Sequence, residues 1–170
     1  SLGQGIFFAL GGYAAAMYLQ LNSSSDLPNG IPEFFSLYGV DQLPAFWVPF
    51  HSPLFTLVAI WLVPAVLAAV LGNLVFRNRI KGVYFSILTQ AALLVFFNFF
   101  NGQQKLINGT NGLKTDVTEL FGQMVGSPEM QRSFFWLTAV VVILAWLFLR
   151  WVVRGRFGDV LIAIRDDEPR

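Results

Sequence analysis

The sequence predicts an all-α, polytopic integral membrane protein, and three observations point to this fold class. Hydrophobic residues make up 55% of the chain and charged residues 12%, about half the charged fraction of an ordinary soluble domain. Several stretches long enough to cross a bilayer carry no formal charge. The basic residues gather in the segments on one side of these stretches. Lipid, and not water, is therefore expected to cover most of the helical surface.

The composition also excludes several classes of protein. The net charge is only +1 and no basic run forms a face for phosphate backbones, so a nucleic-acid partner is not expected. The chain has no cysteine, which excludes disulfides and thiolate chemistry. It begins with "SLGQG" and stops after a run of charge, so we expect an internal piece of a longer protein, with residues 1–170 forming part of one transmembrane domain.

Four apolar stretches are predicted to form membrane spans, at about residues 5–21, 53–76, 82–100 and 133–153. A helix needs roughly 20 apolar residues to cross a hydrocarbon core of about 30 Å, because its backbone polar groups must be satisfied within the helix. The last three stretches meet this requirement, and Pro64 is expected to kink the second. The first is shorter and rich in small residues, so it is expected to pack against protein.

Small residues follow one predicted helix face in the first stretch. Gly5, Ala9, Gly12 and Ala16 recur at spacings of four, three and four, which places them in one line. Small residues at this spacing let a neighbouring helix approach closely in a membrane. The alternative is an ordinary buried helix.

The basic residues predict which side of the membrane each connection faces, because short cytoplasmic loops accumulate Lys and Arg. Alternating spans place eight of the eleven basic residues on one side: Arg77, Arg79, Lys81, Arg150, Arg154, Arg156, Arg165 and Arg170. We therefore expect these segments in the cytoplasm and residues 22–52 and 101–132 on the opposite side.

The two outward segments are rich in Gly, Pro, Asn and Ser and are too long for simple turns. We expect them to cap the membrane part and to meet a partner outside, with short interfacial helices at "PEFFSLYG" and "VTELFGQMVG". Plain solvated connectors are the alternative.

Residues suited to catalysis or metal binding do not form a recognisable set. The only histidine, His51, lies near a predicted membrane boundary, where a lone histidine is far more often an interfacial side chain than a ligand or base. No GxxxxGK(S/T) sequence is present to hold ATP phosphates. We expect no catalytic residue, no metal site and no cofactor, and therefore a protein that is not an enzyme.

The third span carries neutral polar residues where ion-driven carriers usually carry charged ones. Tyr84, Ser86, Thr89 and Gln90 lie within two helical turns, and Ser86 and Gln90 share a face. Such side chains suit the passage of a small uncharged or zwitterionic solute. The alternative is hydrogen bonding between helices, which contributes about 0.6 kcal/mol on average in membranes.

The last residues predict a small amphipathic helix over about residues 155–168. Its apolar residues fall at i, i+3, i+4 and i+7, and its charged residues lie off that stripe. Such a helix lies on a membrane surface or inserts in a partner's groove. The mixed charges of "RDDEPR" favour a protein partner. The residues expected to contact it are Arg156, Phe157, Asp159, Val160, Leu161, Ile164, Arg165 and Asp166.

Four stretches in this order resemble one known family: "SLGQGIFFALGGYAAAMYL", "KGVYFSILTQAALL", "NGTNGL" and "GRFGDVLIAIRDDEPR". They are similar to the integral membrane permeases of the branched-chain amino acid and urea ABC importers, the family that includes the LivM type. The similarity covers nearly the whole chain. It is strongest to the urea-type members, the UrtC permeases, through "SILTQA" and "LPAFW".

The resemblance implies an all-helical permease of the cell membrane, surrounded by lipid, that works with other subunits. These are cytoplasmic ATPase subunits, a second homologous permease and an extracytoplasmic solute-binding protein. In this family the loop matching residues 155–170 forms a coupling helix that docks on the ATPase. Urea or a short-chain amide is the expected solute, and a branched-chain amino acid is the alternative. A further alternative is an ATP-independent channel or carrier.

Overall fold

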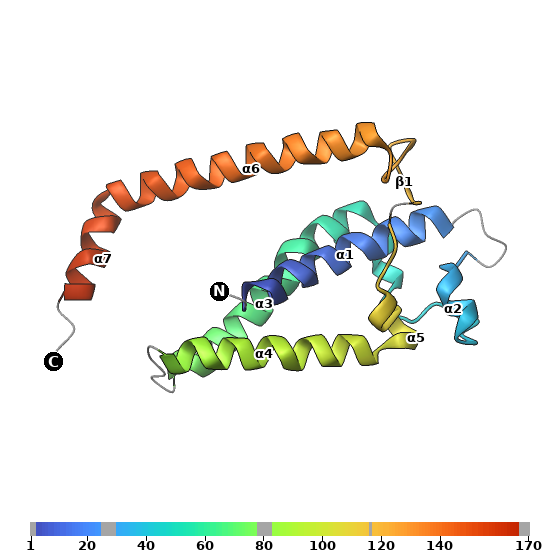
Figure 1. Ribbon diagram of the computed structural model, residues 1–170, viewed down its shortest axis with the longest axis horizontal. Helices are drawn as coiled ribbons and strands as arrows, with labels where there is room; N and C mark the ends of the chain where they lie inside the picture. The colour runs from blue at the N-terminus through green and yellow to red at the C-terminus, as the bar shows by residue number, and fades with distance from the viewer. Residues whose placement is uncertain (1–2, 25–29, 78–82, 116, 167–170) are drawn as a thin grey trace. The chain divides into compact units, whose positions relative to one another are not determined.

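The computed structural model describes residues 3–24, 30–77, 83–115 and 117–166, and these are mostly helical (Figure 1). For Ser24, Phe76, Arg156, Ile164, Arg165 and Asp166 only the backbone is described. The helices are α1 (Gln4–Ser24), α2 (Glu33–Leu37), η1 (Val48–His51), α3 (Pro53–Arg77), α4 (Val83–Gly102), α5 (Gln104–Ile107), η2 (Gly109–Asn111), α6 (Pro128–Arg154) and α7 (Arg156–Asp166). The chain forms two compact units, Ser1–Gly126 and Ser127–Arg170.

Among the described residues, three helices are long and apolar enough to cross a membrane. They are α3 over Pro53–Val75, α4 over Val83–Gly102 and α6 over Pro128–Arg154. α1 is not among them, because glycines, tyrosines and glutamines interrupt its apolar residues. The all-α membrane class predicted from the sequence is confirmed.

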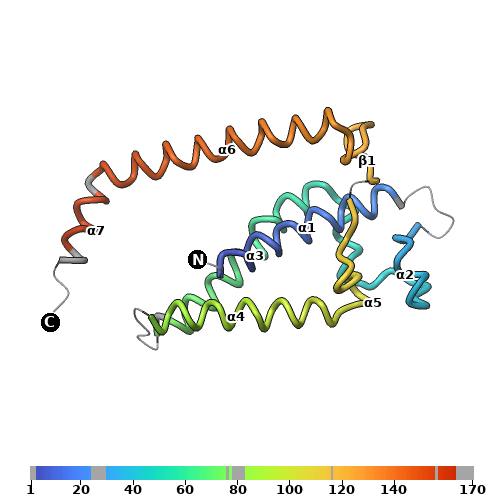
Figure 2. The backbone as a smooth tube through the Cα atoms, viewed as in Figure 1, coloured from blue at the N-terminus to red at the C-terminus, as the bar shows by residue number. Residues whose placement is uncertain are grey.

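The first helix packs along α3, and the two lie side by side in the backbone trace (Figure 2). The buried side of α1 carries Ile6, Ala14, Met17 and Leu21, whose spacings of eight, three and four residues follow one helix face. This pairing gives α1 the protein neighbour that its composition predicts.

The buried side chains lie mainly in the long connections and in α1, and few lie in the three spanning helices. Met17, Leu21, Ile31, Phe34, Phe35, Trp47 and Ile107 form one cluster, called the connector core below. Phe35 and Trp47 are fully buried and their rings meet edge to face at 5.3 Å. The Trp47 indole Nε1 donates to the Leu106 carbonyl oxygen at 2.9 Å, so the two connections are joined by packing and by a hydrogen bond.

The connections contain one predicted helix and one unexpected hairpin. The helix expected at "PEFFSLYG" is present as α2. The helix expected at "VTELFGQMVG" was wrong, because this stretch forms the antiparallel strands β1 (Glu119–Leu120) and β2 (Gln123–Met124). Phe121 and Gly122 between them have φ of 54° and 76°, which fits the two-residue turn that hairpins prefer and ends any helix.

The second unit is a long helix followed by a short one. α6 begins with Pro128 in the first turn, where proline is well tolerated, and the Ser127 hydroxyl caps it by accepting from the Met130 N–H at 3.3 Å. It ends at Arg154, and after Gly155 the chain turns into α7. The amphipathic helix expected over residues 155–168 is thus observed over Arg156–Asp166, and its last two predicted residues lie outside the described part of the chain.

Candidate functional site

A narrow groove of about 150 Å³ lies between α1 and α4. On the α1 side, Gly5 and Ala9 alternate with the larger Ile6, Leu10 and Tyr13, and the α4 side is mostly aromatic. The lining includes Gly5, Ala9 and Tyr13 from α1, and Leu93, Phe96, Phe97, Phe100 and Asn101 from α4. None of the described residues that line this groove is charged.

The two helices run in the same direction along the groove. A Cβ placed on Gly3 would lie 2.8 Å from the Thr89 Cβ, and the Tyr13 ring stacks on the Phe100 ring further along, with centroids 5.1 Å apart. The close contact at Thr89 involves a branched side chain, so only glycine fits at position 3 without a shift of the helices. The absence of a side chain on Gly3 therefore lets α1 approach α4.

Three of the four predicted polar residues share the α4 face that continues into the groove. Thr89 and Gln90 follow Ser86 by three and four residues, which places all three on the same side of the helix. The Thr89 hydroxyl donates to the Ser86 carbonyl oxygen at 3.0 Å, and Ser86 and Gln90 are exposed within this chain. Tyr84 lies two residues before Ser86, about 200° around the helix, so it faces elsewhere.

The predicted small-residue face is divided between the groove and open surface. Gly5 and Ala9 line the groove, and a Cβ on Gly5 would lie 3.8 Å from Leu93 Cδ1. Gly12 is exposed and a Cβ there would meet nothing within 4 Å, whereas Ala16 is half-buried. Helix packing through this face as a whole stays a prediction.

α1 lies close to the backbone of α3 at a glycine that the spacing pattern missed. A Cβ on Gly11 would lie 3.3 Å from the Ile60 carbonyl oxygen. Pro64 lies inside α3 and has no N–H to donate to this carbonyl, four residues earlier. Gly11 therefore lies beside a carbonyl group that lacks its usual helical N–H donor. The signal available in the sequence was Pro64, which predicts a free carbonyl four residues earlier, at Ile60.

One end of the groove is fixed to the connector core. Asn101 lines the groove, and its backbone oxygen accepts from the Gln104 Nε2 at 3.2 Å. The Tyr38 hydroxyl donates to the Gln104 Oε1 at 3.0 Å. A Cβ on Gly109 would lie 2.5 Å from the same Asn101 oxygen, so glycine is required there. These contacts hold the end of α4 in one position.

A second candidate site is the junction between α6 and α7. A Cβ on Gly158 would overlap the Val153 carbonyl group, and the Gly158 N–H donates to the Gly155 oxygen at 2.8 Å. Any side chain at position 158 would force the two helices apart. By contrast, a Cβ on Gly155 would make only ordinary contacts, the nearest at 3.5 Å to the Trp151 oxygen.

The apolar stripe of α7 is exposed within the chain. Phe157, Val160 and Leu161 expose between 46% and 60% of their surface, and Asp159 is also exposed. The predicted contact residues Arg156, Ile164, Arg165 and Asp166 have side chains outside the described set. An exposed apolar stripe on a short amphipathic helix is available for a partner.

Groups that could bind a metal ion do not gather in the part of the chain that the structure describes. His51 is exposed, and its Nδ1 lies 3.0 Å from the Val48 carbonyl oxygen in the same turn of η1. Its position agrees with an interfacial side chain.

Comparison with known protein families assigns the chain to one of them. The model of the permease component of the branched-chain amino acid transport system matches residues 1–170. The chain belongs to this permease family. Neither curated proteins nor solved structures give a match. The permease is a multi-pass protein of the cell membrane, and ABC permeases of this kind work in general with ATPase and binding-protein partners.

Proposed function

We propose that this permease moves urea or a short-chain amide across the cell membrane in an ATP-driven importer. The observation that carries the proposal is the uncharged groove between α1 and α4, with Ser86, Thr89 and Gln90 on the α4 face that continues from it. Urea is neutral and both donates and accepts hydrogen bonds. An amide and two hydroxyl groups offer both functions without a buried charge, whose desolvation would be costly.

A branched-chain amino acid is the second candidate solute. The family description favours it, as does the position of the polar set in the first two turns of α4. The helix dipole favours a carboxylate near Ser86, in the first turn of α4. Leu93 and the groove phenylalanines would suit an aliphatic side chain.

The mechanism requires the cytoplasmic ATPase subunits to act on α7. In the proposed complex, Phe157, Val160 and Leu161 insert in a groove of the ATPase, and Asp159 and the charged residues Arg156, Arg165 and Asp166 border this contact. ATP binding and hydrolysis then move α7, and α6 transmits the motion because Gly158 packs against Val153. A second homologous permease completes the pathway, and an extracytoplasmic binding protein delivers the solute.

Uptake by the assembled transporter tests the solute. Proteoliposomes that contain the full permease with its partners should take up labelled urea in an ATP-dependent manner. Gln90→Leu should lower urea uptake about tenfold, because a lost hydrogen bond contributes up to about 1.5 kcal/mol. Tyr84→Phe, on another face of α4, is the control and should transport normally. ATP-dependent uptake of leucine without urea would favour the second candidate, and flux of either solute without ATP would contradict the importer.

Gly158 tests the coupling mechanism. Gly158→Ala should lower uptake more than tenfold while the permease remains in the membrane, because the new Cβ has no space beside Val153. Gly155→Ala adds the same atom where space exists and should retain uptake. Equal uptake in the two variants would show that the junction does not transmit the motion.

A further inference from the structure

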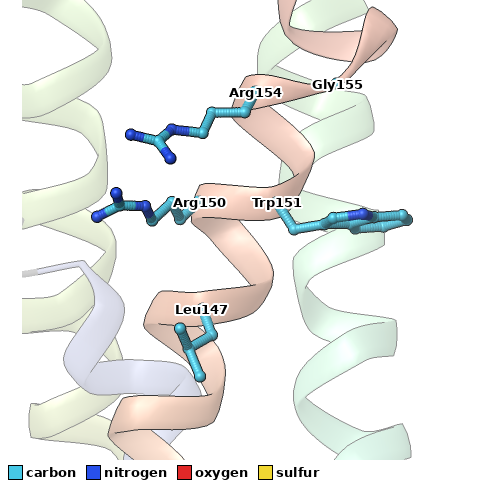
Figure 3. A pocket seen from close by; sticks show the side chains of 5 residues that line it. All are labelled: Leu147, Arg150, Trp151, Arg154 and Gly155. Atoms are coloured by element: carbon cyan, nitrogen blue, oxygen red, sulfur yellow. The ribbon is translucent and has the colours of Figure 1, made fainter.

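A shallow pocket of about 360 Å³ lies at the end of α6, where the helix meets α7 (Figure 3). It is lined by Leu147, Arg150, Trp151, Arg154 and Gly155, and no carboxylate is among these residues. The Arg150 and Arg154 side chains extend from the same side of α6, while the Trp151 ring points away from them. The pocket therefore presents two guanidinium groups to one position beside the helix.

The position of the two arginines along α6 corresponds to the level of the lipid headgroups. Arg132 and Arg150 are separated by 18 residues, or about 27 Å of helix, close to the thickness of a hydrocarbon core of about 30 Å. Residues 133–149 carry no charge, and the side chains before Arg150, such as Phe148 and Leu149, are exposed by 60% and 59%. The arginines thus lie at the boundary between acyl chains and water.

The surroundings of the pair favour an amphiphilic ligand. The Arg150 guanidinium carbon lies 5.1 Å from the centre of the Trp146 ring, which holds the charge beside an aromatic face. Leu147 provides an apolar surface one turn before Arg150. A guanidinium group binds phosphate through two parallel hydrogen bonds, and Leu147 would contact the adjoining hydrocarbon.

We infer that Arg150 and Arg154 form a binding site for the phosphate of an anionic membrane phospholipid. A bound lipid would lie directly beside Gly155, where α6 turns into α7, so it would support the helix that the ATPase is proposed to move. An acidic surface of a partner protein is the competing ligand. The apolar surface next to the pair and its depth at the end of a span favour the lipid.

The test measures lipid binding by native mass spectrometry on the assembled transporter, released from nanodiscs of phosphatidylcholine with or without one quarter phosphatidylglycerol. The paired substitution R150Q/R154Q should lower phosphatidylglycerol affinity about thirtyfold, since each basic residue near a membrane surface contributes about fivefold. R150K/R154K keeps the charge and should show an intermediate loss, because lysine cannot form the paired hydrogen bonds. Arg132→Gln removes one charge at the opposite end of α6 and should change the affinity less than twofold.

Two results would overturn the inference. One is unchanged phosphatidylglycerol binding in R150Q/R154Q. If that variant kept the lipid but lost the ATPase subunits, the arginines would bind the partner protein and not the lipid. The other is displacement of the lipid by millimolar inorganic phosphate, which would indicate a simple anion site. Retention of the lipid in the presence of phosphate supports the lipid site. Both readouts are independent of the transported solute.

Discussion

The connector core and the membrane helices bury their apolar residues to very different extents. In the connector core, Phe35 and Trp47 are completely enclosed by other parts of the same chain. In the spanning helices α4 and α6 none of the most apolar window is buried, and in α3 only 11% is. The connections therefore pack on one another and on the end of α1, whereas the spans depend on lipid or other protein to cover them.

The connector core and the spans are therefore stabilised by different interactions. The connector core relies on burial away from water, and each of its large side chains removes apolar area from solvent. The spans gain little from contact with other apolar groups inside a bilayer, because lipid tails are equally apolar, so close backbone approach and polar contacts matter more. Substitutions in the two regions should therefore differ in size and in cause.

The largest effect is expected in the connector core. Trp47→Ala should lower the free energy of unfolding by about 3–5 kcal/mol, because it leaves a cavity and removes the hydrogen bond to the Leu106 oxygen. Thermal unfolding of the purified permease in detergent measures the loss. Phe46→Ala is the control, since Phe46 is 46% exposed and should lose much less. Similar losses of unfolding free energy in the two variants would show that burial in the connector core does not set the stability of this region.

A smaller effect is expected where α1 approaches α3. Gly11→Leu should destabilise by about 1–3 kcal/mol, because the side chain must displace the backbone at Ile60. Gly12→Leu places the same side chain in open space and should be close to neutral within this chain. A large loss for Gly12→Leu in the assembled transporter, with none in the isolated permease, would reveal a neighbouring helix at the predicted small-residue face.

The smallest effect is expected on the surface of α6. Val142 is 61% exposed, and Val142→Ala should change the free energy of unfolding by less than about 0.5 kcal/mol, because an apolar residue replaces another against lipid. The same thermal measurement applies. A loss above about 2 kcal/mol would mean that this face of α6 is covered by protein.

The sequence predicted the membrane class and the family because these depend on composition and on local order. Long uncharged stretches must be helical in lipid, whatever surrounds them. The helix α2 and the amphipathic character of α7 also follow from local residues. The hairpin was missed because it depends on the positive φ of Phe121, a conformation that phenylalanine rarely adopts and that no local pattern predicts.

Of the residues predicted for the site, Gly5 and Ala9 line the groove, and Ser86, Thr89 and Gln90 lie on the α4 face that continues from it, so their role in transport stays a prediction. The spacing selected Gly12 and missed Gly11, because only the neighbouring Ile60 shows that Gly11 is the glycine in close contact. The requirement for glycine at Gly158 likewise appears only when Val153 is seen beside it.

Local chemistry alone therefore determined that this chain is a set of membrane helices with a charged amphipathic end, since hydropathy and helical spacing act within a few turns. The tertiary structure decided which glycines are needed, which face of α4 borders the groove, and that the connections share one core. Each of these depends on contacts between residues far apart in the sequence, such as Trp47 with Leu106, which no local pattern encodes.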